Sequence, residues 1–129
     1  MAAEQPHLPR QTLIDSHGDG GFRFAGMSHR GSLLCLPDGI WAWSVAGPAV
    51  LTDVALLDKA LAPALERAGD LDFFILGTGA APWVAPKQLR ERFRELHVSF
   101  DAMMTGPAVR TYNVMLMESR RVGAALIAE

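Results

Sequence analysis

The second half of the sequence alternates between strand patterns and helical patterns, and this alternation restricts the fold more than any other feature. Residues 71–76 are nearly all apolar, as is typical of a strand covered on both faces. Further strands are predicted at 97–103 and 122–128, with helices starting at Pro86 and at Gly106 between them. The order strand, helix, strand, helix, strand favours parallel strands with helices packed on the faces of the sheet.

The first half is predicted to form hairpins. A helix is expected after the N-cap residue Thr52, with an interruption at Pro63. Ser28 and His29 are expected to lie in a turn. We therefore expect a flexible tail at residues 1–11 and a single α/β domain at 12–129, with a mixed sheet and an additional N-terminal β layer. The predicted strands are 12–17, 21–25, 32–36 and 40–45, with turns at 18–21 and 37–39.

Composition excludes several classes of protein. Of 129 residues, 50% are hydrophobic and 20% are charged, which is the opposite of a disordered chain. The formal net charge is −2, so no basic excess indicates a nucleic-acid partner. Cys35 is the single cysteine, which excludes an intrachain disulfide, and its apolar neighbours indicate a core position. We find no secretory signal and no apolar run of ~18 residues for a transmembrane segment, so a cytoplasmic protein is expected.

The glycine-rich segment after residues 71–76 is one candidate for chemistry. Gly77, Thr78 and Gly79 follow a buried strand, where backbone N–H groups can face an anion. The dinucleotide-binding fingerprint fails because Pro82 occupies the place of its third glycine, and no phosphate-loop lysine follows. Two interpretations stay open, a ligand-binding loop and a tight structural turn. We favour the turn.

The start of the last helix is the other candidate. Thr105 and Arg110 lie near its N-terminus, where backbone N–H groups are free for a cap or a ligand. Tyr112 and Asn113 carry polar groups on an otherwise apolar stripe, so each needs a partner if it is buried. These four residues either complete a ligand site with the glycine-rich loop or tie the helix to a neighbouring loop. We favour the second interpretation.

Neither a catalytic set nor a metal-binding set can be identified. The histidines have no ligand partner three or four residues away, and no Gly-x-Ser-x-Gly motif is present. We therefore predict no catalytic residues, no metal ligands and no cofactor. The histidines are His7, His17, His29 and His97.

An ordered set of segments carries a resemblance to a known family: Leu76-Gly77-Thr78-Gly79, Pro86, Met104-Thr105-Gly106, Arg110-Thr111-Tyr112-Asn113 and Arg120-Arg121-Val122. From about Ile14 to Ile127, the chain resembles the Mth-type domain family. That family includes uncharacterised bacterial and archaeal proteins, mitochondrial assembly factors of respiratory complex I and an adipogenesis-associated protein. The resemblance implies three layers around a central mixed sheet and no established enzyme activity. Pro107 and Ser119 depart from the family pattern, in which alanine and glycine are expected.

Two functions are compatible with these observations. The first is a non-enzymatic interaction module that assists assembly of a respiratory, complex I-like, or other membrane-associated complex. Its protein partners are unidentified, with respiratory-complex subunits among the candidates. The alternative is a small-molecule or anion-binding protein, or an undetected enzyme. Its site would lie between the loop of Gly77, Thr78 and Gly79 and the helix start at 105–113.

Overall fold

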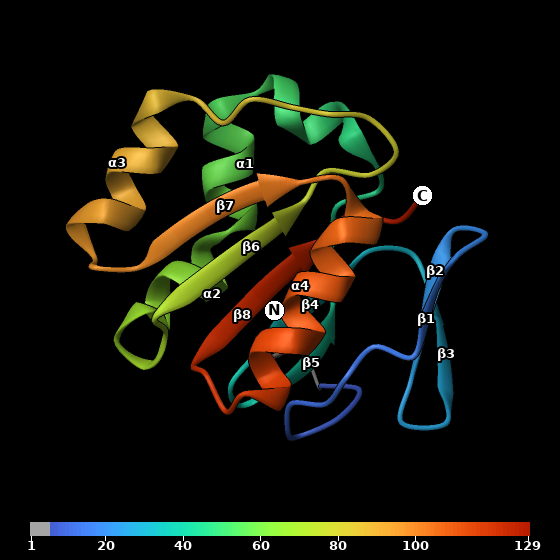
Figure 1. Ribbon diagram of the computed structural model, residues 1–129. Helices are drawn as coiled ribbons and strands as arrows, with labels where there is room; N and C mark the ends of the chain where they lie inside the picture. Colours follow the sequence, from blue (N-terminus) through green and yellow to red (C-terminus); the bar gives the residue numbers. More distant parts are fainter. Residues whose placement is uncertain (1–5) are drawn as a thin grey trace.

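Two β-sheets and four α-helices make up the computed structural model, which describes residues 6–129 (Figure 1). The strands are β1 (Ser16–Gly18), β2 (Gly21–Phe24), β3 (Met27–Arg30), β4 (Leu33–Leu36), β5 (Gly39–Ala42), β6 (Phe73–Gly77), β7 (Ser99–Met103) and β8 (Val122–Leu126). The helices are α1 (Val54–Ala60), α2 (Ala62–Glu66), α3 (Lys87–Glu95) and α4 (Thr105–Met117), with the 3-10 helices η1 (Pro48–Thr52) and η2 (Ala68–Asp70). The larger sheet has the order β5-β4-β8-β6-β7, and the smaller sheet has the order β1-β2-β3.

The five-stranded sheet separates two hydrophobic cores. Helices α1, α2 and α3 cover one face, while α4 and the three-stranded sheet lie on the other (Figure 1). Alternate residues of β6 therefore enter different cores: Phe74 packs with the ring of Phe93 from α3, and Ile75 packs in the core of Val109 from α4. This arrangement confirms the predicted α/β domain with three layers, a central mixed sheet and an extra N-terminal β layer.

The parallel pairing expected in the second half is also confirmed. β6 pairs in parallel with both β7 and β8, and Gly77 at its end is opposite Met103 and Leu126. The carboxyl ends of three parallel strands therefore meet at one edge of the sheet. The glycine-rich loop and the first turn of α4, which begins at Thr105, lie at this edge.

The prediction that Ser28 and His29 lie in a turn is wrong. Both belong to β3, which pairs antiparallel with β2. The turn falls earlier, at Ala25 and Gly26, which have φ values of 48° and 74°. Strand β3 alternates half-buried and exposed side chains but has only Met27 as an apolar residue, so its pattern is weak in the sequence.

Two predicted element starts differ from the structure. Asp53, and not Thr52, caps α1, because its carboxylate accepts a hydrogen bond from Leu56 N–H at 3.1 Å. The predicted strand at 12–17 contributes only its last two residues to β1. The predicted division into two short helices is confirmed: α1 ends at Ala60, Leu61 lies between the helices, and Pro63 is in the first turn of α2.

Part of the predicted tail lies against the larger sheet. Residues 1–5 lie outside the described residues. Further along, Leu8 forms an isolated antiparallel bridge with Ile40 of β5, and the Gln11 side chain donates to the carbonyl of Val122 at 2.6 Å. The segment from residue 6 to residue 11 thus has hydrogen-bonded partners on two strands.

The two departures from the family pattern lie at the two ends of α4. Pro107 is in the first turn, where its missing N–H has no helical partner to lose. Ser119 follows the helix with a φ of 61°, in the left-handed region that glycine occupies without strain. The glycine that the resemblance leads us to expect here would adopt this conformation without strain.

Replacing Ser119 by glycine should stabilise the protein. Glycine removes the steric cost of the left-handed conformation, so Ser119→Gly is expected to raise the free energy of unfolding by about 1 kcal/mol. Urea denaturation followed by circular dichroism measures this change. Ser119→Ala is the matched control and should bring no gain, because alanine keeps the Cβ; an equal gain in both variants would contradict the explanation.

Candidate functional site

The side chain of Thr105 joins the ends of β6 and β8 to α4. It is fully buried, and its Oγ1 donates to the carbonyl of Ile127 at 2.7 Å while accepting from Gly79 N–H at 2.9 Å. The backbone completes the network: Thr105 N–H donates to the Gly79 carbonyl and Ile127 N–H donates to the Gly77 carbonyl, both at 3.0 Å. One hydroxyl group therefore holds three elements together.

The two glycines of the loop have different physical roles. At Gly77, a Cβ would lie 3.0 Å from both Thr105 Oγ1 and Leu126 Cδ2, so glycine permits the close approach of α4 to the sheet. At Gly79, the φ of 87° is a backbone conformation that other residues rarely adopt. Both observations agree with the interpretation of this loop as a structural turn.

Thr78 is also bonded inside the protein. Its side chain is buried, its Oγ1 donates to the Ala81 carbonyl at 2.8 Å, and its N–H donates to the Met103 carbonyl at 2.8 Å. Together with Gly79 N–H, these donors are occupied by protein acceptors. The hydroxyl and N–H groups that a ligand-binding loop would offer to an anion therefore stabilise the loop itself.

The side-chain amide of Asn113 bonds to both backbone polar groups of Ile14, as a neighbouring strand would. Its Oδ1 accepts from Ile14 N–H at 2.9 Å, and its Nδ2 donates to the Ile14 carbonyl at 2.8 Å. Tyr112, one residue earlier and buried, donates its hydroxyl to the carbonyl of Thr12 at 2.9 Å. These side chains tie α4 to residues 12–14, which is a different partner from the glycine-rich loop.

Tyr112 and Cys35 meet in the core beneath this contact. Burial raises the pKa of the Tyr112 hydroxyl, and the neighbouring Cys35 adds to the effect. Burial likewise raises the pKa of the Cys35 thiol to about 12. Both groups are therefore neutral near pH 7, and Cys35 is a core residue as its neighbours in the sequence indicate.

The seven predicted ligand-binding residues do not form one cluster. Gly77, Thr78, Gly79 and Thr105 come together at the strand ends, whereas Tyr112 and Asn113 face residues 12–14. Arg110 is exposed and has no ion pair within residues 6–129; it extends toward Gly106 and His17. Over the same residues, no group of three or more His, Cys, Asp or Glu side chains is placed to hold a metal ion.

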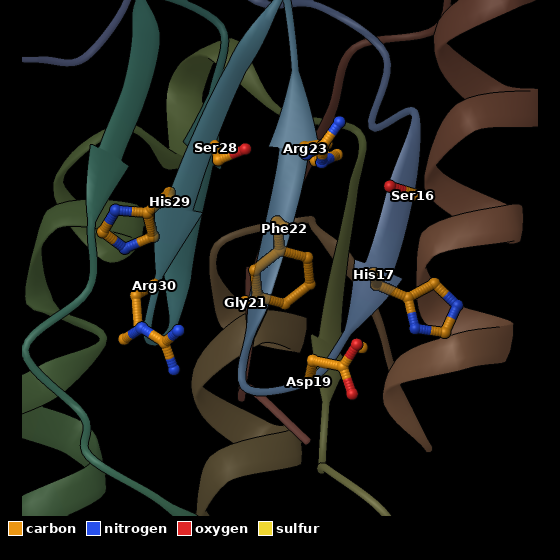
Figure 2. Close-up of a pocket in the computed structure, with 10 residues that line it drawn as sticks. Ser16, His17, Asp19, Gly21, Phe22, Arg23, Ser28, His29 and Arg30 are labelled. Carbon is orange, nitrogen blue, oxygen red and sulfur yellow. The ribbon is translucent and has the colours of Figure 1, made fainter.

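Two surface features were not anticipated from the sequence. The first is a hollow of about 420 Å³ on the three-stranded sheet, with Arg23 and Arg30 in its lining (Figure 2). The alternation of Phe22, Arg23 and Phe24 indicates an arginine on the outer face of β2. The neighbours of that arginine become visible only when β3, a strand missed in the sequence, is paired with β2.

The second feature is an apolar groove of about 330 Å³ beside α1, here called the α1 groove. Two hydrogen bonds shape it: Trp43 Nε1 donates to the Ala60 carbonyl at 2.8 Å, and Asp53 caps α1. Leu56 is 52% exposed at its side. The groove is lined by Ser44, Val45, Ala46, Gly47, Ala49, Val50, Leu56, Lys59 and Ala60.

A family model and a solved structure identify the relatives of this chain. The model of the protein family of unknown function DUF498/DUF598 matches residues 14–127. A Bordetella pertussis protein described as an Mth938-like domain has the same fold, with a TM-score of 0.71 at 23% identity over 98% of this chain and 92% of that chain. None of the helices within residues 6–129 has the length and apolar character that a membrane crossing requires.

More similar structures come from other bacteria. A Rhodopseudomonas palustris protein is 51% identical, with a TM-score of 0.81 over 98% of this chain and 90% of that chain. A Bartonella henselae protein described as an outer membrane protein is 43% identical, with a TM-score of 0.83 over 95% of this chain and 98% of that chain.

A mouse protein, NADH dehydrogenase [ubiquinone] 1 alpha subcomplex assembly factor 3, is 27% identical over 124 residues. The match covers 95% of this chain and 64% of the mouse protein. The chain therefore spans less than two thirds of this relative.

Replacing Gly79 should destabilise the loop. Gly79→Ala is expected to lower the free energy of unfolding by about 1–2 kcal/mol, because alanine is strained at a φ of 87°. Chemical denaturation measures the loss. Gly69→Ala is the control and should change stability by less than about 0.5 kcal/mol, since its Cβ meets no atom within 4 Å and its φ lies outside the left-handed region. Equal losses would contradict the special role of Gly79.

Removing the Asn113 amide should leave the backbone N–H and the backbone carbonyl of Ile14 without hydrogen-bond partners. Asn113→Ala is expected to cost about 1–3 kcal/mol of folding stability, the usual penalty for unpaired buried groups. Arg110→Ala, on the exposed side of the same helix, serves as the control, with an expected change within about 0.5 kcal/mol. A loss below about 0.5 kcal/mol for Asn113→Ala would instead indicate a side chain paired with water at a ligand site.

Proposed function

We propose, from the premise that this chain belongs to the DUF498/DUF598 family, that it is a non-enzymatic interaction module that assists assembly of a membrane-associated complex. Membership of the family confirms the resemblance to the Mth-type domain. The proposal starts from the mouse relative, whose name describes it as an assembly factor for an NADH dehydrogenase. A respiratory complex of that type is therefore the favoured partner.

The α1 groove is the observation in this chain that carries the proposal. Apolar side chains form most of its lining, and Leu56 stands half-exposed beside it. An apolar concavity on a protein surface is the usual receptor for a hydrophobic side chain of a partner. The occupant that fits is an apolar side chain from a subunit that is not yet incorporated into its complex.

Hydrogen bonds within the protein fix the shape of the α1 groove in the absence of a partner. The Trp43 indole bonds to the C-terminal end of α1 at Ala60, and Asp53 caps its N-terminal end. A partner therefore meets a surface whose shape is already set, which reduces the entropy lost on binding. This feature favours reversible capture of a subunit without chemistry.

The alternative ligand site at the glycine-rich loop has less support. The hydroxyl groups of Thr78 and Thr105 and the N–H of Gly79 are bonded to protein acceptors, so a ligand would have to displace those bonds. Breaking them leaves buried groups unpaired at a cost of about 1–3 kcal/mol each.

An assembly role is also compatible with a cytoplasmic location, where the chain would meet subunits before they join the membrane complex.

Affinity capture from a detergent-treated whole-cell extract, which contains subunits before and after they join the membrane complex, tests the assembly role. The intact protein should enrich subunits of an NADH dehydrogenase-type complex, and Leu56→Lys should reduce their recovery about tenfold because a charge would enter the groove. Leu56 is 52% exposed, so the substitution should leave stability within about 0.5 kcal/mol.

Val114→Lys provides the matched control for this experiment. Val114 is 49% exposed on α4, across the sheet from the α1 groove, so its replacement should leave recovery unchanged. Recovery of general chaperones alone would contradict the assembly role. Equal losses for both variants would assign the interaction to non-specific apolar contact instead of the groove.

A further inference from the structure

The outer face of the three-stranded sheet carries a hollow with an unusual lining for an acidic chain. Strand register places Ser16, Arg23 and Ser28 side by side across β1, β2 and β3, as Figure 2 shows. Two residues further along, Gly18 and Gly21 are in one row with Arg30. Since side chains alternate along a strand, both rows project from the same face of the sheet.

The two arginines have no acidic partner in the part of the chain that the structure describes. Arg67, Arg92, Arg120 and Arg121 each form an ion pair there, whereas Arg23 and Arg30 form none. Asp19 is the only carboxylate in the lining of the hollow. The lining therefore holds two arginines and one carboxylate, and the carboxylate of Glu129 lies next to it, 3.1 Å from His17 Nδ1.

The spacing of the arginines suits a single anionic group. Arg23 pairs with Ser28, so Arg30 is its diagonal neighbour on β3, and such neighbours lie roughly 7–8 Å apart at the backbone. In Figure 2 the two guanidinium groups point away from one another, and Arg30 Nη1 lies near Gly20, 3.9 Å from the place of a Cβ there. Rotation of these long, exposed side chains would bring both to one tetrahedral anion. The hydroxyl groups of Ser16 and Ser28 flank Arg23 and supply further donors.

Glycine keeps the floor of the hollow open. A Cβ at Gly21 would lie 2.3 Å from the backbone oxygen of His29, so no side chain fits there while β2 and β3 stay paired. Gly18 and Gly20 have φ values of 127° and 80°, which favour glycine in the turn between β1 and β2. Bare backbone thus lies beside Arg30 instead of covering side chains.

The sheet beneath the hollow is fixed to the rest of the protein. Gly20 N–H donates to the Glu129 carbonyl at 2.7 Å, and Gly31 N–H donates to the Gly20 carbonyl at 2.7 Å. His29, on the inner face, contacts the Ser32 carbonyl through Nε2 and His7 Nε2 through Nδ1, both at 3.0 Å. The arginines are therefore presented by an anchored sheet and not by a free hairpin.

We propose that this hollow binds a phosphate group, held by Arg23 and Arg30 with Ser16 and Ser28 as hydroxyl donors. Arginine binds phosphate through paired N–H groups, and charge-assisted bonds of this type are the stronger hydrogen bonds in proteins. The phosphate group belongs either to a free phosphate monoester or to the headgroup of a phospholipid. This site lies away from the α1 groove and does not depend on the assembly role.

Two binding arms distinguish the sources of phosphate. In the first, inorganic phosphate and glycerol 3-phosphate are titrated into the ¹⁵N-labelled protein, and chemical shifts of residues 16–30 are followed. In the second, co-sedimentation is measured with phosphatidylcholine vesicles that contain or lack phosphatidylglycerol. Binding in the first arm supports a free monoester, and binding in the second arm alone supports a phospholipid headgroup.

Substitutions test the residues assigned to the site. Arg23→Gln and Arg30→Gln should each weaken binding about tenfold, Arg23→Lys should restore part of the affinity, and Ser28→Ala should weaken it about threefold. Arg94→Gln, an exposed arginine on α3, should leave binding unchanged. Absence of binding in both arms would overturn the proposal, and so would an equal effect of Arg94→Gln, since it would show unspecific attraction by surface charge.

Discussion

The hydroxyl group of Thr105 is the contact on which the arrangement of the second half depends. Three parallel strands end at one edge of the sheet. The backbone N–H and carbonyl groups that follow them need hydrogen-bond partners where they are buried. The Thr105 hydroxyl pairs with two of these groups, because it donates to the carbonyl of Ile127 and accepts from Gly79 N–H. Gly77 allows the helix to come close enough for both bonds. The carboxyl ends of the strands are the position where α/β proteins often bind ligands, and in this chain hydrogen bonds join the loop, the helix and the end of β8 there.

A second constraint attaches the N-terminal layer. Within residues 6–129, no strand pairs with the segment before β1 at Ile14, so its backbone needs other partners. The amide of Asn113 supplies both a donor and an acceptor, as a strand would, and Tyr112 adds a bond to Thr12. Helix α4 therefore serves two layers at once. Its first turn is bonded to the larger sheet, and its middle is bonded to the segment that leads into the smaller sheet.

The sequence predicted the second half better than the first for physical reasons. Buried parallel strands and amphipathic helices produce long apolar patterns, so β6, α3, α4 and β8 were predictable in type and order. Strand β3 has a single apolar residue, Met27, because one of its faces lies in solvent and His29 occupies the other, so its pattern does not predict a strand. For the candidate site, the need for partners at Tyr112 and Asn113 was predictable from their polarity. The identity of those partners, about a hundred residues away, was not.

Neither surface feature has a distinctive pattern in the sequence. The α1 groove combines residues 44–50 with residues 56–60, and none of its apolar members differs from a core residue in type. The hollow on the three-stranded sheet depends on the register between strands, which sets Ser16 and Ser28 on either side of Arg23. The five-stranded sheet separates the helices beside the groove from the sheet that carries the hollow, with different cores on its two faces. Because residues that share no contacts act nearly independently, each surface can be altered while the other keeps its shape.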